Sequence, residues 1–418
     1  MSTTELIREM PVAPYIAEMV QLVTFSECDE VLKSRKFAQG SHRESSVFIG
    51  DSLIVLDGDA HFDRRRMESA LFTRNALEYY ESKTLAPHVQ EVMGAAAARG
   101  RRAEEQVAAD LVPIVRAMMA RITATITGLD GVDTIEATER FITYVEQLNK
   151  GVTVEWSVEN HDMVIARTMD ARARLVADFY QPSLARRQEL VERHRRGELA
   201  ADELPIDLLT MLLLNWEDGW DAEFALRECT LFYVAATQTT THAVPHVVAH
   251  LDAWVREHPD DAARLADPAF LKLAAYESLR LHVPVHALLR HATEDVELKS
   301  GRRIAAGTRV ACCFSPANRD RSVFGEDAAE FNPYRVTEAA KPWGLSFGGG
   351  PHMCIGRALV TGLSSATDGS DATAGTIVRI LAGLYRAGIR LDPDAPREYV
   401  ATTHVDAYQR FPVLFSAL

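Results

Sequence analysis

Residues 347–357 read Phe-Gly-Gly-Gly-Pro-His-Met-Cys-Ile-Gly-Arg and place one cysteine, Cys354, in a glycine-rich turn before an apolar, helix-like run. Consecutive glycines reach backbone conformations that residues with a Cβ avoid, so this loop can lie flat against a large group. A sulfur at the start of a helix lies near unpaired N–H groups and the positive end of the helix dipole, and both favour the thiolate over the thiol. The stretch therefore predicts a hydrogen-bonded thiolate with one open face.

A thiolate in such a loop has several interpretations. Zinc is disfavoured, because structural zinc sites need paired ligands at short spacings, and no second cysteine or suitable histidine pair lies nearby. A phosphate-binding loop is disfavoured because Gly348 and its neighbours are not followed by the Lys-Ser/Thr that such a loop needs. A nucleophilic cysteine with His352 as its base, and a buried inert cysteine, both stay open on this stretch alone.

The wider pattern Phe347-x-x-Gly350-x-x-x-Cys354-x-Gly356 resembles the haem-binding loop of the cytochrome P-450 family, the haem-thiolate monooxygenases. The resemblance implies that Cys354 is the proximal ligand of the iron in a haem b (iron protoporphyrin IX), where its electron donation favours O–O cleavage. It also implies that other loop residues contact the haem: Phe347, Gly348, Gly350, His352 and Gly356.

The longest expected helix runs over residues 221–257, about 55 Å at 1.5 Å per residue, and must cross the whole domain. Its centre, residues 235–241, reads Ala-Ala-Thr-Gln-Thr-Thr-Thr, and Pro245 follows. Small and hydroxylated residues weaken a helix, and proline removes a backbone donor, so the sequence predicts a kink beside which another group can lie.

In the resembling family the matching helix carries Ala-Gly-x-Asp/Glu-Thr-Thr. The match implies that Ala235 and Ala236 lie against the haem and that a catalytic set serves oxygen activation: Thr239, Gln238 and Thr240. Two positions depart from the pattern, because Ala236 replaces the glycine and Gln238 replaces the acid. Gln238 has the shape of Glu without a titratable proton, so the usual proton donor is missing.

His61 and Arg65 lie four residues apart at the start of an expected helical run over residues 62–80. At that spacing they share one helix face. On their own they read as a solvated basic face, whereas the resemblance implies that they bind the haem propionates together with Arg290 and His352.

Glu277 and Arg280 meet on one face of a helix expected over residues 269–281, where a surface ion pair is the ordinary reading. The resemblance instead makes them structural partners of Arg335, in the segment Phe-Asn-Pro-Tyr-Arg. It also implies a set of substrate-pocket residues: Phe48, Ala235, Val285, His286, Leu288 and Thr403. His286 is a candidate polar handle for a substrate oxygen, although a satisfied structural histidine is the commoner case.

Composition sets further bounds. Hydrophobic residues make up 47% of the 418 residues, enough for a sizeable core, and the net charge of -14 argues against nucleic acid or an anionic membrane surface as a partner. The five cysteines show no disulfide framework, which indicates a reducing compartment. No signal peptide and no stretch of about 18 apolar residues occurs, so we expect a cytoplasmic location.

We therefore expect a mainly α fold with small β-sheets (α+β), the cytochrome P-450 fold, with the long helix over a haem held by the cysteine loop. Residues 1–418 are expected to form a single domain with a shortened N-terminal region, 1–60, while polar residues 364–371 are an insertion loop, an alternative helix or a disordered stretch. Other expected elements include a helix capped by Ser26, a helical run over 107–127, and strands over 295–298, 303–314, 389–391, 400–404 and 412–415.

The function implied is a bacterial-type monooxygenase that activates O2 to oxidise a small organic substrate. The length leaves no room for a fused flavin or iron–sulfur unit beside a haem domain, so electrons are expected from a ferredoxin or flavodoxin and its reductase. Two alternatives stay open: a haem-thiolate catalyst that uses peroxide or performs coupling or dehydration, and a non-catalytic haem-binding sensor.

Overall fold

The computed structural model describes residues 6, 14–103, 106–217, 220–363, 373–400 and 406–416. They fall into two compact units. Unit 1 comprises Met1–Ser41, Met93–Val115 and Thr239–Leu418, and unit 2 comprises His42–Val92 and Arg116–Gln238. The long helix α12 (Ala222–Glu257) contributes its first part to unit 2 and the rest to unit 1.

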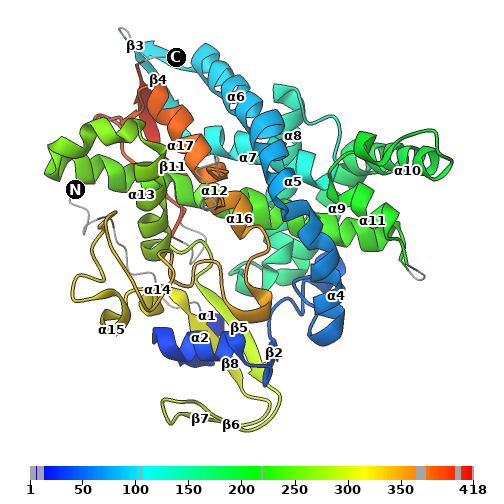
Figure 1. The fold of residues 1–418 in the computed structure, drawn as a ribbon, viewed down its shortest axis with the longest axis horizontal. Helices are drawn as coiled ribbons and strands as arrows, with labels where there is room; N and C mark the ends of the chain where they lie inside the picture. Colours follow the sequence, from blue (N-terminus) through cyan, green and yellow to red (C-terminus); the bar gives the residue numbers. More distant parts are fainter. Residues whose placement is uncertain are drawn as a thin grey trace. The chain divides into compact units, whose positions relative to one another are not determined.

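The described part of unit 2 is helical (Figure 1). Its elements are α3 (Ser46–Ile49), α4 (Gly58–Glu68), η2 (Ser69–Phe72), α5 (Arg74–Tyr79), η3 (Tyr80–Leu85), most of α7 (Leu111–Thr127), α8 (Ile135–Val152), η4 (Val154–Trp156), α9 (His161–Leu175), η5 (Val176–Tyr180), α10 (Gln181–Arg195), η6 (Ala201–Glu203) and α11 (Leu208–Leu214). Helix α6 (Ala86–Arg99) starts in this unit and ends in unit 1. Apolar stripes of these helices meet in a core where the Phe141 ring contacts Phe179 and Tyr233 edge-on, each at 5.7 Å between centroids.

All described strands belong to unit 1, and its main sheet joins segments from the two ends of the chain. Strand β1 (Val20–Leu22) pairs in parallel with β8 (Arg309–Cys313), β8 pairs antiparallel with β5 (Ala287–Ala292), and β5 pairs antiparallel with β2 (Phe37–Gln39). Helix α2 (Phe25–Lys33) packs its apolar side against this sheet, as Figure 1 shows for the blue helix beside β5 and β8. A buried core therefore fixes the position of β5.

A second sheet has the order β3-β4-β12-β9, formed by β3 (Arg101–Ala103), β4 (Gln106–Asp110), β12 (Pro412–Phe415) and β9 (Arg390–Leu391). Two small hairpins are β6 (Val296–Glu297) with β7 (Arg303–Ile304) and β10 (Glu398–Tyr399) with β11 (Tyr408–Arg410). The remaining helices of unit 1 are α1 (Pro14–Ala17), η7 (Pro259–Ala266), α13 (Pro268–Leu281), α14 (Phe314–Ala317), α15 (Arg321–Phe324), η8 (Gly350–His352), α16 (Arg357–Thr361) and α17 (Thr376–Arg386).

The predicted class, mainly α with small sheets, is confirmed, and so are the helices expected over 221–257 and 269–281. Several local predictions were wrong. Thr24 rather than Ser26 caps α2, because its side chain accepts the Glu27 N–H. Residues 107–110 form a strand paired with β12, not the start of a helix, and the helix at His61 begins at Gly58 and ends at Glu68.

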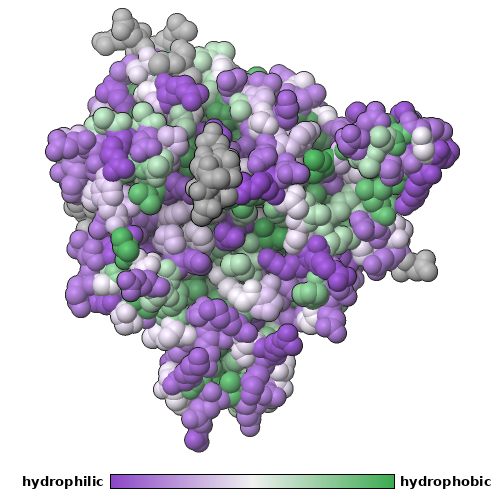
Figure 2. All heavy atoms as spheres, viewed as in Figure 1, coloured by the Kyte–Doolittle hydropathy of each residue, from purple (hydrophilic) through white to green (hydrophobic). Residues whose placement is uncertain are grey.

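The face of the molecule in Figure 2 is mainly hydrophilic, with apolar residues in small groups. Among the described residues, no helix combines the length and apolar character needed to span a bilayer. The segments expected at 364–371 and around Thr403 lie outside the described residues.

Candidate active site

The cysteine loop has the strained, tightly bonded backbone that its glycines predict. Gly348 and Gly350 adopt φ values of +69° and +63°, which side chains rarely reach. The Cys354 N–H donates to the Phe347 carbonyl at 2.8 Å, and α16 begins three residues after the cysteine, at Arg357. Cys354 is exposed, which is unusual for a free cysteine. The loop therefore presents one sulfur on an open face.

Close packing holds this loop against two other elements of unit 1. A Cβ on Gly350 would lie 2.0 Å from the Leu32 carbonyl oxygen of α2, and one on Gly348 would lie 3.3 Å from Leu288 Cδ1 on β5. No side chain fits at Gly350 without moving α2. The glycines are thus needed for contact with the protein as well as for their backbone angles.

Phe347 is held from one side by aromatic contacts. The Trp343 ring meets Phe347 edge-on at 5.7 Å and Tyr276 at 5.0 Å between centroids. The Arg357 guanidinium lies 5.5 Å from the Trp343 ring centroid. This cluster fixes the residue whose carbonyl accepts the Cys354 N–H.

The predicted partners Glu277, Arg280 and Arg335 form a buried network. Arg280 Nε and Nη2 donate to the two oxygens of Glu277 at 2.8 and 2.7 Å, and Arg335 Nε donates to Glu277 Oε1 at 2.9 Å. Arg335 also pairs with Asp327 at 2.7 Å. The Arg280 and Glu277 side chains are 0% and 4% exposed, so these two charges are desolvated and depend on one another, whereas the Asp327 side chain is 46% exposed.

Asn318 extends this network to the cysteine loop, and sequence reasoning missed it. Its backbone carbonyl accepts from Arg280 Nη1 at 2.6 Å. Its side chain accepts the Leu345 N–H at 2.7 Å and donates to Ser346 Oγ at 3.1 Å, immediately before Phe347. A lone asparagine in a polar segment gives no sequence signal, because its partners lie 27 to 38 residues away.

Arg290 lies on β5 and is buried, with 2% of its surface exposed. One of its terminal nitrogens donates to Gln39 Oε1 of β2 at 2.7 Å and to the Leu289 carbonyl at 2.8 Å. Gly40 passes so close that its Cβ would lie 3.0 Å from the Arg290 backbone. A guanidinium is therefore fixed by the sheet that also contacts Gly348 through Leu288.

The centre of α12 leaves one stripe open. Ala235 is exposed and Ala236 and Thr239 are partly exposed, whereas Gln238 and Thr240 are buried. Within unit 2, Thr237 Oγ1 donates to Thr123 Oγ1 at 3.4 Å. Because alanine is small and this one is exposed on a largely buried helix, a flat group could lie against the helix at this point.

His61 and Arg65 lie on α4 in unit 2, where His61 is buried and Arg65 is partly exposed. A cluster that the sequence did not reveal holds this helix: Arg64 Nη1 donates to Glu228 Oε2 of α12 at 2.6 Å, and the Leu53 N–H donates to Glu228 Oε1 at 3.0 Å. The Arg64 guanidinium also covers the Phe224 ring, 4.3 Å from its centroid.

Glu68 completes this cluster, one turn after Arg64. It is fully buried, and among the described residues no N–H donor lies within hydrogen-bond distance of either carboxyl oxygen. Burial, followed by repulsion from Glu228 and a hydrogen bond between the two carboxyl groups, raises the pKa of the Glu68 carboxyl well above its usual range. Glu68 therefore holds its proton more tightly than an exposed glutamate does, and Arg64 forms an ion pair with Glu228.

The predicted pocket residues are distributed over both units. Phe48 is buried against Gly151 of α8, whose Cβ would lie 2.8 Å from its ring. In unit 1, Val285 is 40% exposed and Leu288 faces the cysteine loop. Both ring nitrogens of His286 have protein partners, Ser315 Oγ at 3.2 Å and the Asp406 N–H at 3.0 Å.

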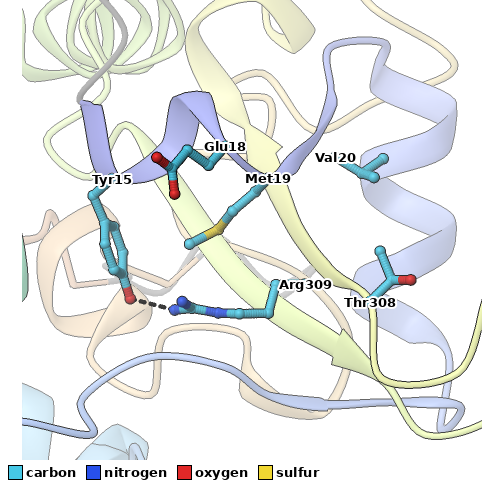
Figure 3. A pocket seen from close by; sticks show the side chains of 6 residues that line it. All are labelled: Tyr15, Glu18, Met19, Val20, Thr308 and Arg309. Atoms are coloured by element: carbon cyan, nitrogen blue, oxygen red, sulfur yellow. Dashed lines mark hydrogen bonds between the residues drawn. The ribbon is translucent and has the colours of Figure 1, made fainter.

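Figure 3 shows an open groove of about 500 Å³ on unit 1, lined by Tyr15, Glu18, Met19, Val20, Thr308 and Arg309. Arg309 crosses it to donate to the Tyr15 hydroxyl, and its guanidinium lies 4.9 Å from the Tyr15 ring centroid. None of these residues belongs to the predicted site. The groove and the cysteine loop are separate features.

The cysteine loop fits a haem better than a protein-ligated ion. Among the described residues, the one cluster of three close metal-ligating side chains is His246, His282 and Asp406, which does not include Cys354. An exposed cysteine outside that cluster suits an iron whose other ligands come from a macrocycle. Within the same unit, the buried Arg290 on the adjoining strand suits a propionate.

A family model described as Cytochrome P450 matches residues 12–361. The chain belongs to the cytochrome P450 family. This membership supports the expected enzyme class, a monooxygenase oxidoreductase, and a haem cofactor. The resemblance read from the cysteine loop is confirmed.

Related P450 sequences are distant. Cytochrome P450 109 of Bacillus spizizenii is 27% identical over 325 residues, covering 74% of this chain and 68% of that protein. The biotin biosynthesis cytochrome P450 of Bacillus subtilis is 31% identical over 176 residues, 41% of this chain, and the match spans only 40% of that protein. Cytochrome P450-SU2 of Streptomyces griseolus is 36% identical over 178 residues, covering 42% of this chain and 41% of that protein.

Solved P450 structures match nearly the whole chain. Substrate-free CYP109E1 from Bacillus megaterium gives a TM-score of 0.71 at 20% identity, covering 96% of this chain and 94% of that one. P450BioI in complex with an acyl carrier protein ligated to hexadec-9Z-enoic acid gives 0.67 at 20% identity, covering 94% and 92%. At these identities the likeness shows the P450 fold.

The buried network predicts a large effect of Glu277→Ala. Removing the carboxylate leaves two buried guanidinium groups without their partner, so we expect the free energy of unfolding to fall by about 3–5 kcal/mol in chemical denaturation. The control is Glu297→Ala, which breaks the pair with Arg303, whose side chains are 58% and 84% exposed. Because exposed pairs contribute about 0–1 kcal/mol, equal losses in the two variants would contradict the network's role.

The raised pKa of Glu68 predicts a pH-dependent effect of Glu68→Gln. The folded state holds this proton more tightly than the unfolded chain, so the Glu68 contribution is complete below the unfolded pKa and is lost as pH rises. Glutamine cannot ionise. The stability of the variant relative to wild type should therefore increase as the pH rises above the ordinary glutamate pKa of about 4.5, by about 1.4 kcal/mol for each unit of pKa shift.

Thermal and chemical unfolding across this pH range measure the difference. The matched control is Glu78→Gln on neighbouring α5, whose side chain is 50% exposed. A flat difference for Glu68→Gln would show that Glu68 is ionised in the folded protein.

Proposed function

We propose that the protein is a haem-thiolate monooxygenase that inserts one oxygen atom of O2 into a small organic substrate. The observation that carries this proposal is Cys354, a lone exposed cysteine fixed by a backbone bond to Phe347 in a loop that tolerates no side chain at Gly350. Among the described residues, Cys354 does not belong to the cluster of metal-ligating side chains. Its sulfur would bind the iron of haem b.

We assign the other parts of the cofactor site to the following residues. The Cys354 sulfur would bind the iron, and Arg290 would supply a fixed cation for a propionate, with His61, Arg65 and His352 as further contacts. The Phe347 ring, held by Trp343, would shield the sulfur from water. When bound, haem with a thiolate ligand supplies the reductive activation of O2, which consumes two electrons and two protons.

Proton delivery falls to the residues at the centre of α12. The partly exposed Thr239 would supply the hydroxyl that takes part in this delivery. The buried Thr240 would be a second hydroxyl close to it. The Gln238 amide can hold a water or a substrate group but cannot release a proton at neutral pH. Protons would reach Thr239 through water or through the substrate itself.

Separate proteins would supply the electrons, either a ferredoxin or a flavodoxin with its reductase. The substrate class differs among relatives of this fold. CYP109E1 is described in complex with testosterone, and P450BioI with a fatty acid carried on acyl carrier protein. A screen of small molecules by the Soret shift of the ferric protein would identify the class used here.

The thiolate assignment is tested by Cys354→Ala. Wild type, reduced and treated with carbon monoxide, should show the long-wavelength Soret band of thiolate-ligated haem, and the variant should lose it completely because the loop contains no other cysteine, and the thioether of Met353 cannot form a thiolate. The control is Cys313→Ser, a partly buried cysteine at the end of β8, which should keep the band. The proposal fails if wild type lacks the band or Cys354→Ala retains it.

The glutamine at position 238 favours a second candidate function, catalysis with hydrogen peroxide, because peroxide carries its own protons. If O2 is the oxidant, Gln238→Glu should raise the product formed per electron pair by a factor of about 2 to 10 and change the solvent isotope effect. Gln238→Leu, which has no polar group, is the control and should not raise it. Unchanged coupling in Gln238→Glu, together with turnover on millimolar peroxide, would favour the second candidate.

A further inference from the structure

Asp406 is held by three histidines, through its backbone N–H, its backbone carbonyl and one carboxylate oxygen. His282 Nδ1 bonds Asp406 Oδ2 at 2.8 Å, His246 Nε2 donates to the Asp406 carbonyl at 2.8 Å, and the Asp406 N–H donates to His286 Nε2 at 3.0 Å. All of these residues belong to unit 1. His246 is on α12, His282 caps the end of α13, and His286 immediately precedes β5.

The hydrogen bonds to His282 and His286 hold the two ends of the turn that joins α13 to β5. That turn, residues 282–286, leads into the Ala287–Ala292 strand that carries Leu288 and Arg290. The His286 carbonyl is fixed as well, because it accepts the Phe314 N–H at 2.8 Å. The path of Val285 and Leu288 therefore depends on where Asp406 lies.

We infer that Asp406 is a positioning residue for the substrate pocket, setting the wall formed by Val285 and Leu288 through its bonds to His282 and His286. The inference rests on the proposed function. It assigns a role to Asp406, whose bonds to His246, His282 and His286 lie outside the cysteine loop and the Glu277–Arg280 pair. It also accounts for both ring nitrogens of His286, which hold the turn and have no capacity left for a substrate oxygen.

The cluster is built for hydrogen bonds and not for a metal ion. The His246 and His282 rings are stacked, with centroids 3.9 Å apart and planes at 14°. A ring nitrogen binds a metal in the plane of its ring, at about 2.0–2.1 Å for zinc. Two stacked, nearly parallel rings cannot both direct a lone pair at one ion.

His246 and His282 are neutral at physiological pH. Burial lowers the pKa of His246 to about 3, and it also lowers the pKa of His282, with Asp406 acting in the opposite direction. A neutral His282 that donates from Nδ1 leaves the Asp406 carboxylate as the acceptor. The arrangement is a fixed set of directional bonds, as a positioning role requires.

The test compares side-chain variants that keep or lose each bond in the haem-loaded protein. Asp406→Ala removes the acceptor for His282, whereas Asp406→Asn keeps a carbonyl oxygen there. His286→Leu removes the acceptor for the Asp406 N–H, whereas His286→Gln places an amide oxygen near the position of Nε2. Each pair differs in one bond and little in volume or backbone propensity.

Two ligands distinguish a change in the pocket wall from a change at the iron. Imidazole binds the iron alone, and 4-phenylimidazole also places a phenyl ring against the wall, so the ratio of their dissociation constants reports the wall. We expect this ratio to shift by about tenfold in Asp406→Ala and His286→Leu, the effect of leaving a buried polar group unpaired. It should stay within about twofold of wild type in Asp406→Asn and His286→Gln.

A purely structural role would lower the melting temperature of the Ala and Leu variants and leave the ratio unchanged, and that result would overturn the inference. Hydrogen exchange of the peptide covering residues 282–288 gives a readout independent of ligand binding, with faster exchange expected in Asp406→Ala and near wild-type exchange in Asp406→Asn. The carbon-monoxide band of each variant is recorded in parallel. Loss of that band from wild type would count against the proposed function, and unchanged exchange would count against Asp406.

Discussion

The Arg280 guanidinium, fully buried in unit 1, is the group on which the arrangement around Cys354 depends. Its Nε and Nη2 donate to Glu277, its Nη1 donates to the carbonyls of Asn318 and Ala328, and Nη2 also reaches the Glu330 carbonyl. This one guanidinium therefore holds α13 against the segment 318–330. Because desolvating an arginine is costly, the fold tolerates this group only when each of these acceptors is in place. Asn318 then transmits the constraint to Leu345 and Ser346, directly before the cysteine loop.

Helix α12 shows the same principle repeated along its length. It places several polar side chains in the interior, and four of them, Glu228, Thr237, His246 and His250, have a hydrogen-bond partner on another element of the same unit. In unit 2, Glu228 pairs with Arg64 of α4, and Thr237 bonds Thr123 of α7. In unit 1, His246 bonds Asp406, and His250 Nδ1 lies 3.0 Å from Ser278 Oγ of α13. An apolar helix would pack in many rotations and registers, whereas these directional bonds select one, which matters for a helix that must present Ala235 and Thr239 on a chosen side.

The sequence predicted what depends on neighbouring residues and missed what depends on distant ones. The cysteine loop was readable because its glycines and its sulfur lie within eleven residues, and α12 because its length and pattern are local. Strand β5 was not foreseen, although it carries Arg290, since a six-residue strand acquires its identity only from partners such as Gln39 on β2. Residues 107–110 were mistaken for helix because their pairing with β12 links positions some three hundred residues apart. Asn318, Glu68 and Asp406 were missed for the same reason: their types are common, and only the fold shows their partners.

The P450 pattern has an acidic residue where this chain has Gln238. The neighbouring residues of α12 do not supply an acid in its place. Glu228 is the nearest buried carboxylate earlier on that helix, but it lies ten residues away, about 15 Å along the axis. Its oxygens are already engaged by Arg64 and the Leu53 N–H, so it stabilises α4 and the turn before it. Burial and Glu228 raise the pKa of Glu68, so this carboxyl is a poor proton donor. Glu68 and Glu228 therefore serve the packing of unit 2, and the polar side chains at positions 237–241 of α12 are hydroxyl and amide groups. Under the proposed function, protons would come from water or from the substrate rather than from a carboxylate on α12.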